Sequence, residues 1–327
     1  MVIDGTKSRF VKVLSGIPQG TVLAALCFLI FINDLPQSVT KSFTGLFCDD
    51  TVLAKEITTE NDSDELQQDL DNVFEWTKLW GMSFNTLKCE YMSITNKKKI
   101  LKTQYHLGSV NLKQKDFVKY LGITIDKKLS FNQHIKQKAK SATTVLNMLR
   151  RNLYFAPKSV KIKAYQSCVL PIIEYAPCSW QPTSESASKT LEMVQHNAAR
   201  FISSAYSKKG NFKVFSITKI LKDLKMDTLE ERRTHARLSM AYKIINELVI
   251  LEPKFLPKFT NKRIQRGCNF AKVGIENQLL EPQARLNSNQ NTFFYSIPKI
   301  WNQKVTPEQA KAPSFDAFKQ HFKRNTI

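Results

Sequence analysis

Hydrophobic and polar residues follow two different periods along this chain, and the period changes near Phe131. Before that point, short apolar runs stand beside turn signals, as at Phe43 to Phe47 and at Thr51 to Ile57, and Val118 to Ile125 alternates apolar with polar positions. These patterns are typical of β-strands. After Phe131, apolar residues recur every three or four positions, as in amphipathic helices. The pattern therefore predicts an α+β first part followed by an all-helical remainder.

Two helices interrupt the strand pattern of the first part. The apolar run from Val22 to Ile32 lies in a candidate helix that stops at Pro36, and its uniform hydrophobicity predicts that this helix is buried. The run is too short to span a membrane, which takes about 20 residues. Asp62 and Glu65 resemble a capping box and predict the start of the second helix. The helices predicted for the remainder span residues 132–154, 158–176, 186–206, 228–249, 294–303 and 313–324.

The first thirteen residues alternate around an Asp4-Gly5 turn signal and predict a hairpin whose second strand is Phe10 to Val13. The first strand then holds only Met1, Val2 and Ile3. Because three residues pair poorly, we expect the chain to begin inside a structural unit whose partner strands are missing.

Charge and cysteine usage suggest a partner and a compartment. Lys and Arg number 49 against 28 Asp and Glu, and residues 87–163 hold 18 against 3, a net charge of +15, whereas residues 1–86 carry −6. A polyanion such as nucleic acid fits this surplus, although an acidic substrate, an anionic membrane or a set of solvated lysines would also produce it. The six cysteines lie far apart, without metal-ligand spacing, and no signal peptide or membrane span is recognisable. We therefore expect reduced thiols in an intracellular protein of the cytoplasm or nucleus.

Asp49 and Asp50 form the main candidate for chemistry. Two adjacent carboxylates at a tight turn repel each other unless a cation neutralises them, and nucleotidyl transfer uses two Mg²⁺ ions held by such oxygen ligands. An ordinary polar turn is the alternative for an isolated Asp-Asp pair.

The surrounding residues favour the metal site. Phe47-Cys48-Asp49-Asp50 follows Ser15-Gly16-Ile17-Pro18-Gln19-Gly20, with the apolar helix between them. This combination resembles the reverse-transcriptase domain of non-LTR retrotransposons, close to the jockey and CR1-like elements, although the family more often has Ala at the position of Cys48. Further stretches similar to that family are Trp80 to Asn85 with Lys88 and Cys89, Tyr120 to Ile123, Tyr175 to Trp180, Leu191 to Ile202, Phe293 to Asn302 and the final Ala-Pro-Ser-Phe-Asp-Ala-Phe-Lys.

The resemblance implies a fold and a set of roles. The fold would be a partial right-hand polymerase palm, with an antiparallel sheet and helices at residues 1–130, then a helical thumb at 131–206 and a basic helical region at 207–327. The partners would be an RNA template, a DNA primer, the RNA/DNA duplex and a deoxynucleoside triphosphate. By the resemblance, Asp49 and Asp50 bind Mg²⁺; Lys88 lies by the leaving pyrophosphate; Gly16, Pro18, Gln19, Gly20 and Phe47 position template and nucleotide; and Tyr120, Leu121 and Gly122 grip the primer.

One expected carboxylate is missing. The family's first catalytic Asp precedes the motifs found here, and Asp4, in its Asp-Gly turn, does not match it. The sequence thus predicts an amino-terminally truncated reverse transcriptase that is inactive by itself, because one of three metal ligands is absent. The alternative is a non-catalytic, basic nucleic-acid-binding protein derived from a retroelement.

Overall fold

The chain divides into two compact units, Met1–Lys115 and Asp116–Ile327. The computed structural model describes residues 2–9, 12, 16, 20–97, 101, 103–204, 216–259, 278–283 and 290–322, and each unit is described by itself. Mixed helices and small, mostly antiparallel strand pairs confirm the predicted α+β class.

The first unit combines two helices with four two-stranded pairs among its described residues, and the pair of β5 with β8 is parallel. Its elements are β1 (Val2–Ile3), β2 (Thr6–Lys7), α1 (Val22–Ile32), the 3-10 turn η1 (Leu35–Ser38), β3 (Phe43–Phe47), β4 (Asp50–Ala54), α2 (Glu60–Leu79), β5 (Glu90–Tyr91), β6 (His106–Leu107), β7 (Val110–Asn111) and β8 (Lys113–Gln114).

Helix α2 holds the β3–β4 hairpin in place through its buried side chains. Val73 and Trp76 belong to a core onto which Leu46 of β3 and Leu53 of β4 pack. Asp69, fully buried on α2, accepts hydrogen bonds from the backbone N–H groups of Thr40 (2.9 Å) and Lys41 (3.0 Å), directly before β3. The buried carboxylate is thereby hydrogen-bonded, and it fixes where the hairpin starts.

Three sequence-based expectations for this unit were wrong in detail. Helix α1 forms where predicted but is not buried: among its residues only Ile32 is, and Val22 is 90% exposed. Hydrophobicity predicted the helix, but only its Phe28, Phe31 and Ile32 side packs against described residues. The first hairpin pairs Val2–Ile3 with Thr6–Lys7 rather than with Phe10 to Val13, a range mostly outside the described residues. Helix α2 begins one turn before the predicted start, with Thr59 as N-cap and Asp62 as its capping-box partner.

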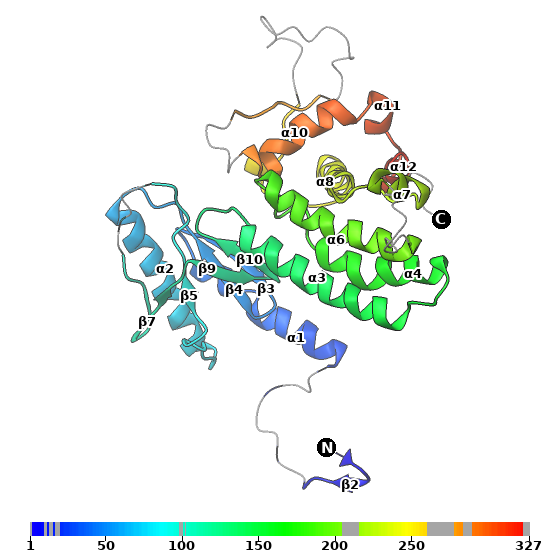
Figure 1. The fold of residues 1–327 in the computed structure, drawn as a ribbon. Helices are drawn as coiled ribbons and strands as arrows, with labels where there is room; N and C mark the ends of the chain where they lie inside the picture. The colour runs from blue at the N-terminus through cyan, green and yellow to red at the C-terminus, as the bar shows by residue number, and fades with distance from the viewer. Residues whose placement is uncertain are drawn as a thin grey trace, which may run out of the picture. The chain divides into compact units, whose positions relative to one another are not determined.

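The second unit places one β-hairpin before a set of helices (Figure 1). Helices α3 and α6 lie side by side, and α8 packs against α6, α10 and α12. The elements are β9 (Phe117–Tyr120), β10 (Ile123–Asp126), α3 (Asn132–Asn152), α4 (Lys158–Ala164), the π-helical turn η2 (Tyr165–Val169), α5 (Leu170–Ile173), α6 (Glu185–Ser203), α7 (Ile217–Asp223), α8 (Leu229–Ile245), the 3-10 turn η3 (Pro253–Phe255), α10 (Phe293–Lys304), α11 (Pro307–Ala310) and α12 (Phe315–Gln320).

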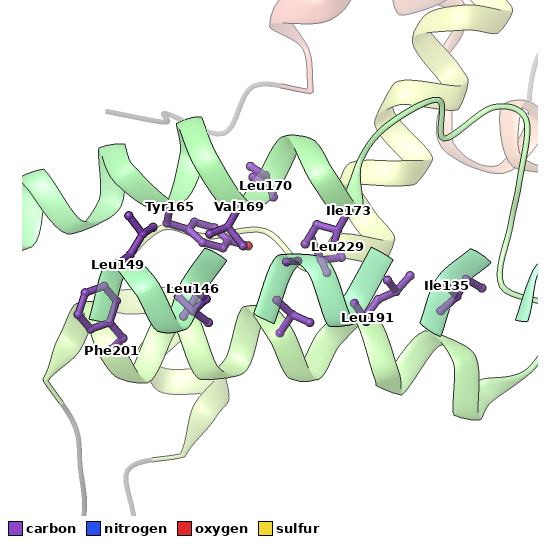
Figure 2. Close-up of a cluster of buried hydrophobic side chains, with 14 of the residues drawn as sticks. Ile135, Leu146, Leu149, Tyr165, Val169, Leu170, Ile173, Leu191, Phe201 and Leu229 are labelled. Atoms are coloured by element: carbon purple, nitrogen blue, oxygen red, sulfur yellow. The ribbon is translucent and has the colours of Figure 1, made fainter. Parts of the chain in front are cut away.

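A continuous apolar core joins α3, α6 and the α4–η2–α5 segment. Figure 2 shows Leu146 and Leu149 of α3 beside Tyr165 of η2 and Phe201 of α6, all of them buried. The phenol of Tyr165 donates to Oε1 of Gln195 (3.0 Å), so its one polar atom is satisfied inside this core. The apolar residues that recur at the helical period after Phe131 thus form this core.

The carboxy-terminal helices build a second core, partly from residues of the motifs quoted above. Trp301 and Phe318 stack with ring centroids 5.8 Å apart, and Phe293 and Tyr242 belong to the same cluster. Asn302 exchanges two hydrogen bonds, both 2.9 Å, with the backbone of Leu279, and so fixes a described segment that has no helix or strand. Among helices in the described ranges, none combines the length and hydrophobicity needed to cross a membrane.

Candidate nucleotidyl-transfer site

The Asp-Asp pair stands at the turn of an antiparallel hairpin, as predicted. Strands β3 and β4 pair from Phe43↔Ala54 to Phe47↔Asp50, which leaves Cys48 and Asp49 as the two turn residues. Cys48 has φ +52°, a left-handed conformation that costs a non-glycine residue roughly 1–2 kcal/mol. Both aspartates are exposed. The backbone therefore presents the two carboxylates at the end of a short, supported hairpin.

The two faces of this hairpin differ. Residues directly opposite each other in an antiparallel pair share a face, and neighbours along one strand alternate between faces. Leu46 and Leu53 therefore lie on the face that packs on the helical core, and the paired Phe47 and Asp50 lie on the other face. Phe47 is 60% exposed. Asp50 thus has an aromatic ring directly opposite it on an open surface.

The remaining predicted residues of this unit belong to two other segments of the chain, one before α1 and one between α2 and β5. Gly16 (φ +88°) and Gly20 (φ +85°) both adopt conformations that favour glycine, which fits a loop before α1. Pro18 and Gln19 lie outside the described residues. Lys88 is exposed, in the segment between α2 and β5, and forms no ion pair with either aspartate in the part of the chain that is described.

The donor set at the hairpin fits part of a magnesium site. Mg²⁺ usually takes one or two protein carboxylates and completes its octahedral shell with water and phosphate oxygens. Asp49 and Asp50 are hard oxygen donors free of competing ion pairs in the described region. No group of three His, Cys, Asp or Glu suited to a metal ion occurs within the described ranges.

The three residues predicted to grip a primer form a turn rather than part of a continuous strand. Tyr120 ends β9 and pairs with Ile123, while Leu121 (φ +45°) and Gly122 (φ +79°) make a two-residue turn. Positive φ at both positions suits a tight hairpin, and the single strand expected at 118–125 was therefore wrong. The tip is tied down by Tyr175, whose hydroxyl donates to the carbonyl of Leu121 (2.9 Å).

Behind this tip lies a buried histidine that motif spacing did not reveal. His134, 1% exposed, accepts a hydrogen bond at Nδ1 from the backbone N–H of Thr124 on β10 (3.1 Å). Its ring packs edge to face on Trp180 at 5.1 Å, and Trp180 Nε1 donates to the carbonyl of Tyr175 (2.8 Å). Burial and the charge of Lys138 lower the pKa of His134 to about 4, so the ring is neutral at pH 7.

Asp126 organises the connection from the β9–β10 hairpin to α3. Its Oδ1 accepts from the backbone N–H groups of Lys128 and Ser130, and its Oδ2 accepts from that of Phe131 (2.7 Å). Burial disfavours the ionised carboxyl, but the hydrogen bonds from Ser130, Lys128 and Phe131 outweigh it and lower the pKa of Asp126. His134 and Asp126 are positioning residues of the fold. In the sequence, the signals for them were weak: His134 stands on the apolar side of a predicted helix, and Asp126 stands directly before a turn.

The helices after this hairpin carry an unbroken positive surplus. Residues 127–173 contain ten Lys or Arg and no Asp or Glu over 47 positions. On α3, Lys136, Lys140 and Arg151 are exposed and recur on one side of the helix. This surface suits a partner with regularly spaced negative charges.

Comparison with known proteins agrees with the motifs. Residues 1–125 match the family described as reverse transcriptase (RNA-dependent DNA polymerase). The probable RNA-directed DNA polymerase from transposon BS of Drosophila melanogaster is 28% identical over 273 residues, covering 79% of this chain and 29% of that protein. The RNA-directed DNA polymerase from mobile element jockey of the same species is 26% identical over 216 residues, covering 62% of this chain and 23% of that protein.

A third relative, the probable RNA-directed DNA polymerase from transposon X-element of Drosophila melanogaster, is 27% identical over 201 residues, or 58% of this chain and 22% of that protein. The chain thus spans less than a third of the length of these relatives. No solved structure matches it significantly. The resemblance found in the motifs is confirmed: residues 1–125 match the reverse transcriptase family, and much of the chain is similar to the RNA-directed DNA polymerases of the transposons BS, X-element and jockey.

Proposed function

We propose that this chain is part of an RNA-directed DNA polymerase in which residues 1–130 contribute to the palm, 131–206 form the thumb and 207–327 form a basic region that assists nucleic-acid binding. One observation carries the proposal: an exposed Asp49-Asp50 pair stands at the turn of a hairpin inside the segment that matches the reverse transcriptase family. The basic helices that follow supply the charge that such a polymerase needs to hold its template and primer.

The roles are those that the resemblance implies for these residues. Asp49 and Asp50 hold Mg²⁺, which when bound supplies the positive charge that stabilises the attacking and leaving oxygens of nucleotidyl transfer. Phe47, on the same open face as Asp50, packs against the nucleotide or template base. The remaining assignments rest on the motifs: Gly16, Pro18, Gln19 and Gly20 shape the loop beside the nucleotide, Lys88 approaches the leaving pyrophosphate, and Tyr120, Leu121 and Gly122 contact the primer.

A third carboxylate is needed for the reaction, and we infer that it comes from a polymerase segment outside these 327 residues. Two carboxylates alone hold one ion loosely and leave the in-line geometry of primer hydroxyl and triphosphate undefined. The chain by itself is therefore inactive in primer extension, although it binds nucleic acid.

A chimera tests this proposal. The polymerase segment that precedes the aligned region in the transposon BS protein is fused to Met1, and extension of a DNA primer on an RNA template is measured with Mg²⁺. We expect no extension by the chain alone and measurable extension by the chimera. Asp49→Asn removes a ligand charge while keeping the shape, so activity falls on the order of 10²-fold or more, and Asp50→Asn impairs it as well.

Asp64→Asn is the matched control, since Asp64 is an exposed carboxylate on α2 of the same unit and its substitution changes the charge equally. Extension by the chimera with Asn at both 49 and 50 would refute the assignment of the aspartates. Extension by the unfused chain would refute the need for a third carboxylate.

The basic stretch supports a second candidate, a non-catalytic nucleic-acid-binding protein. Forty-seven consecutive residues without a carboxylate would retain phosphates whether or not the hairpin binds metal. A folded chimera that binds template and primer tightly but never extends the primer would favour this candidate.

A further inference from the structure

Two aromatic rings stand exposed where α3 turns into α4. Phe155 is 96% exposed and Tyr154 58% exposed, and their rings meet edge to face with centroids 5.0 Å apart. The preceding Leu153 packs on the core of the second unit, and its carbonyl accepts from the N–H of Ala156 (3.1 Å), which closes the turn. A rigid corner thus holds two large apolar rings in water, an unfavourable arrangement that a partner would relieve.

The surroundings of this corner are cationic. Arg151, on the last turn of α3, and Lys158, on the first turn of α4, are both exposed, and the corner lies within the stretch that lacks carboxylates. Lys161 is turned inward, with its ammonium over the Phe201 ring (5.1 Å) and 3.5 Å from Ser204 Oγ. An apolar protein partner or a like-charged surface would have to bury or oppose these cations, whereas a nucleic acid would pair with them.

A row of exposed, mostly basic residues runs along α3 and ends beside this corner. Lys136, Lys140, Thr144 and Arg151 are exposed at helical spacing, so they form one stripe. The fifteen steps from Lys136 to Arg151, at about 1.5 Å each, give a stripe of about 22 Å, the axial length of about six to seven nucleotides at about 3.4 Å per nucleotide of one strand. The stripe is thus long enough to follow a strand whose end reaches the aromatic rings.

We propose that the Tyr154–Phe155 corner is a stacking site for an unpaired base of a nucleic-acid strand, and that the α3 stripe holds the phosphates of the same strand. Aromatic side chains bind bases of any sequence through their π-faces, and basic grooves beside them track the backbone. The inference rests on the proposed function, since it specifies which part of the nucleic acid the helical region binds. The stacking site would allow this surface to recognise a single strand, whereas its positive charge alone would bind duplex and single strands alike.

Binding of the full chain to two fluorescent oligonucleotides tests the site. One is a blunt duplex hairpin, and the other is the same hairpin with a single-stranded overhang that contains 2-aminopurine, whose emission falls when it stacks on an aromatic ring. We expect the wild-type chain to prefer the overhang substrate and to quench it. Phe155→Leu keeps an apolar side chain but removes the π-face, so affinity for the overhang falls five- to tenfold and quenching is lost, while binding to the blunt hairpin is unchanged.

Two further variants control the measurement. Tyr295→Leu removes an exposed aromatic ring from α10 and should change nothing, whereas Phe155→Trp keeps a π-face and should retain the preference and the quenching. Because Phe155 is almost fully exposed, its substitution leaves the fold intact.

Equal binding and quenching by wild type and Phe155→Leu would overturn this inference and leave the proposed function standing. A wild type without preference for the overhang would do the same. If the wild type bound neither oligonucleotide, both this inference and the proposed function would fail.

Discussion

Acidification should destabilise the second unit in part through one buried side chain, His134. The ordinary pKa of histidine is 6.5, and burial together with the Lys138 charge lowers the pKa of His134 to about 4 in the folded protein. Between these values the unfolded chain binds a proton that the folded chain refuses, so stability falls as the pH falls. The contribution is complete above about pH 6.5. At 1.36 kcal/mol per unit of pKa, its loss by pH 4 reaches at most about 3 kcal/mol.

The substitution His134→Asn isolates this effect. The amide oxygen of Asn can accept from the Thr124 N–H in place of Nδ1, but Asn does not titrate. Urea unfolding of the full chain, followed by the helical circular-dichroism signal, is measured between pH 4 and pH 7.5. We expect the variant to be less stable at pH 7.5, because a ring is lost from the contact with Trp180, and to lose less stability on acidification.

The difference between the two proteins is the decisive quantity. Burial also lowers the pKa values of His196 and His235, but these residues are present in both proteins and cancel in the comparison. Parallel pH dependences for wild type and His134→Asn would refute the argument.

Three other outcomes are expected. Gly122→Ala should destabilise the second unit by about 1–2 kcal/mol, because φ is +79° and the new Cβ would lie 3.3 Å from the Tyr175 ring. The control Gly81→Ala has φ +65° and open space around the new Cβ, so it shares only the conformational cost, and equal shifts of the urea midpoint would contradict the contact with Tyr175. Asp69→Ala should leave the Thr40 and Lys41 N–H groups without an acceptor and cost about 2–3 kcal/mol or more, with faster hydrogen exchange at residues 40–55; unchanged exchange would show that the carboxylate is dispensable. Nucleic-acid affinity should fall with salt at a log–log slope of roughly −3.5 to −4.5 if about five phosphates are contacted, and a flat response measured by anisotropy would mean that the lysines are only solvated.

The local sequence pattern predicted the positions of the helices and strands better than it predicted which of their side chains are buried. Most helices after Phe131 and the hairpin around Asp49-Asp50 lie close to the expected ranges, because apolar periodicity and turn residues are local properties, although α7 (Ile217–Asp223) was not predicted. Helix α1 shows the limit: Val22 to Ile32 carries no charged residue, yet most of its side chains are exposed. Burial depends on which surfaces come together, and a single run of residues does not contain that information.

The candidate site shows the same division. Spacing and motif order pointed to Asp49 and Asp50, and the structure places Asp49 in an exposed turn and Asp50 at the exposed first position of β4. The Leu121-Gly122 turn was missed because an apolar residue precedes the glycine, where Asn or Asp would have signalled a hairpin. His134 was passed over since its partners, Thr124 and Trp180, are 10 and 46 positions away and belong to no spacing rule.

The bond between the Tyr175 hydroxyl and the Leu121 carbonyl has an evolutionary consequence. It joins positions 54 residues apart, and the Tyr175 ring leaves no spare room for a side chain at Gly122. A substitution at Gly122 changes which side chains fit at position 175, and the reverse also holds, so the two positions should covary. Among related elements, a larger residue at the position of Gly122 should coincide with a smaller one at the position of Tyr175, and lineages that break the pairing should lose this hairpin turn.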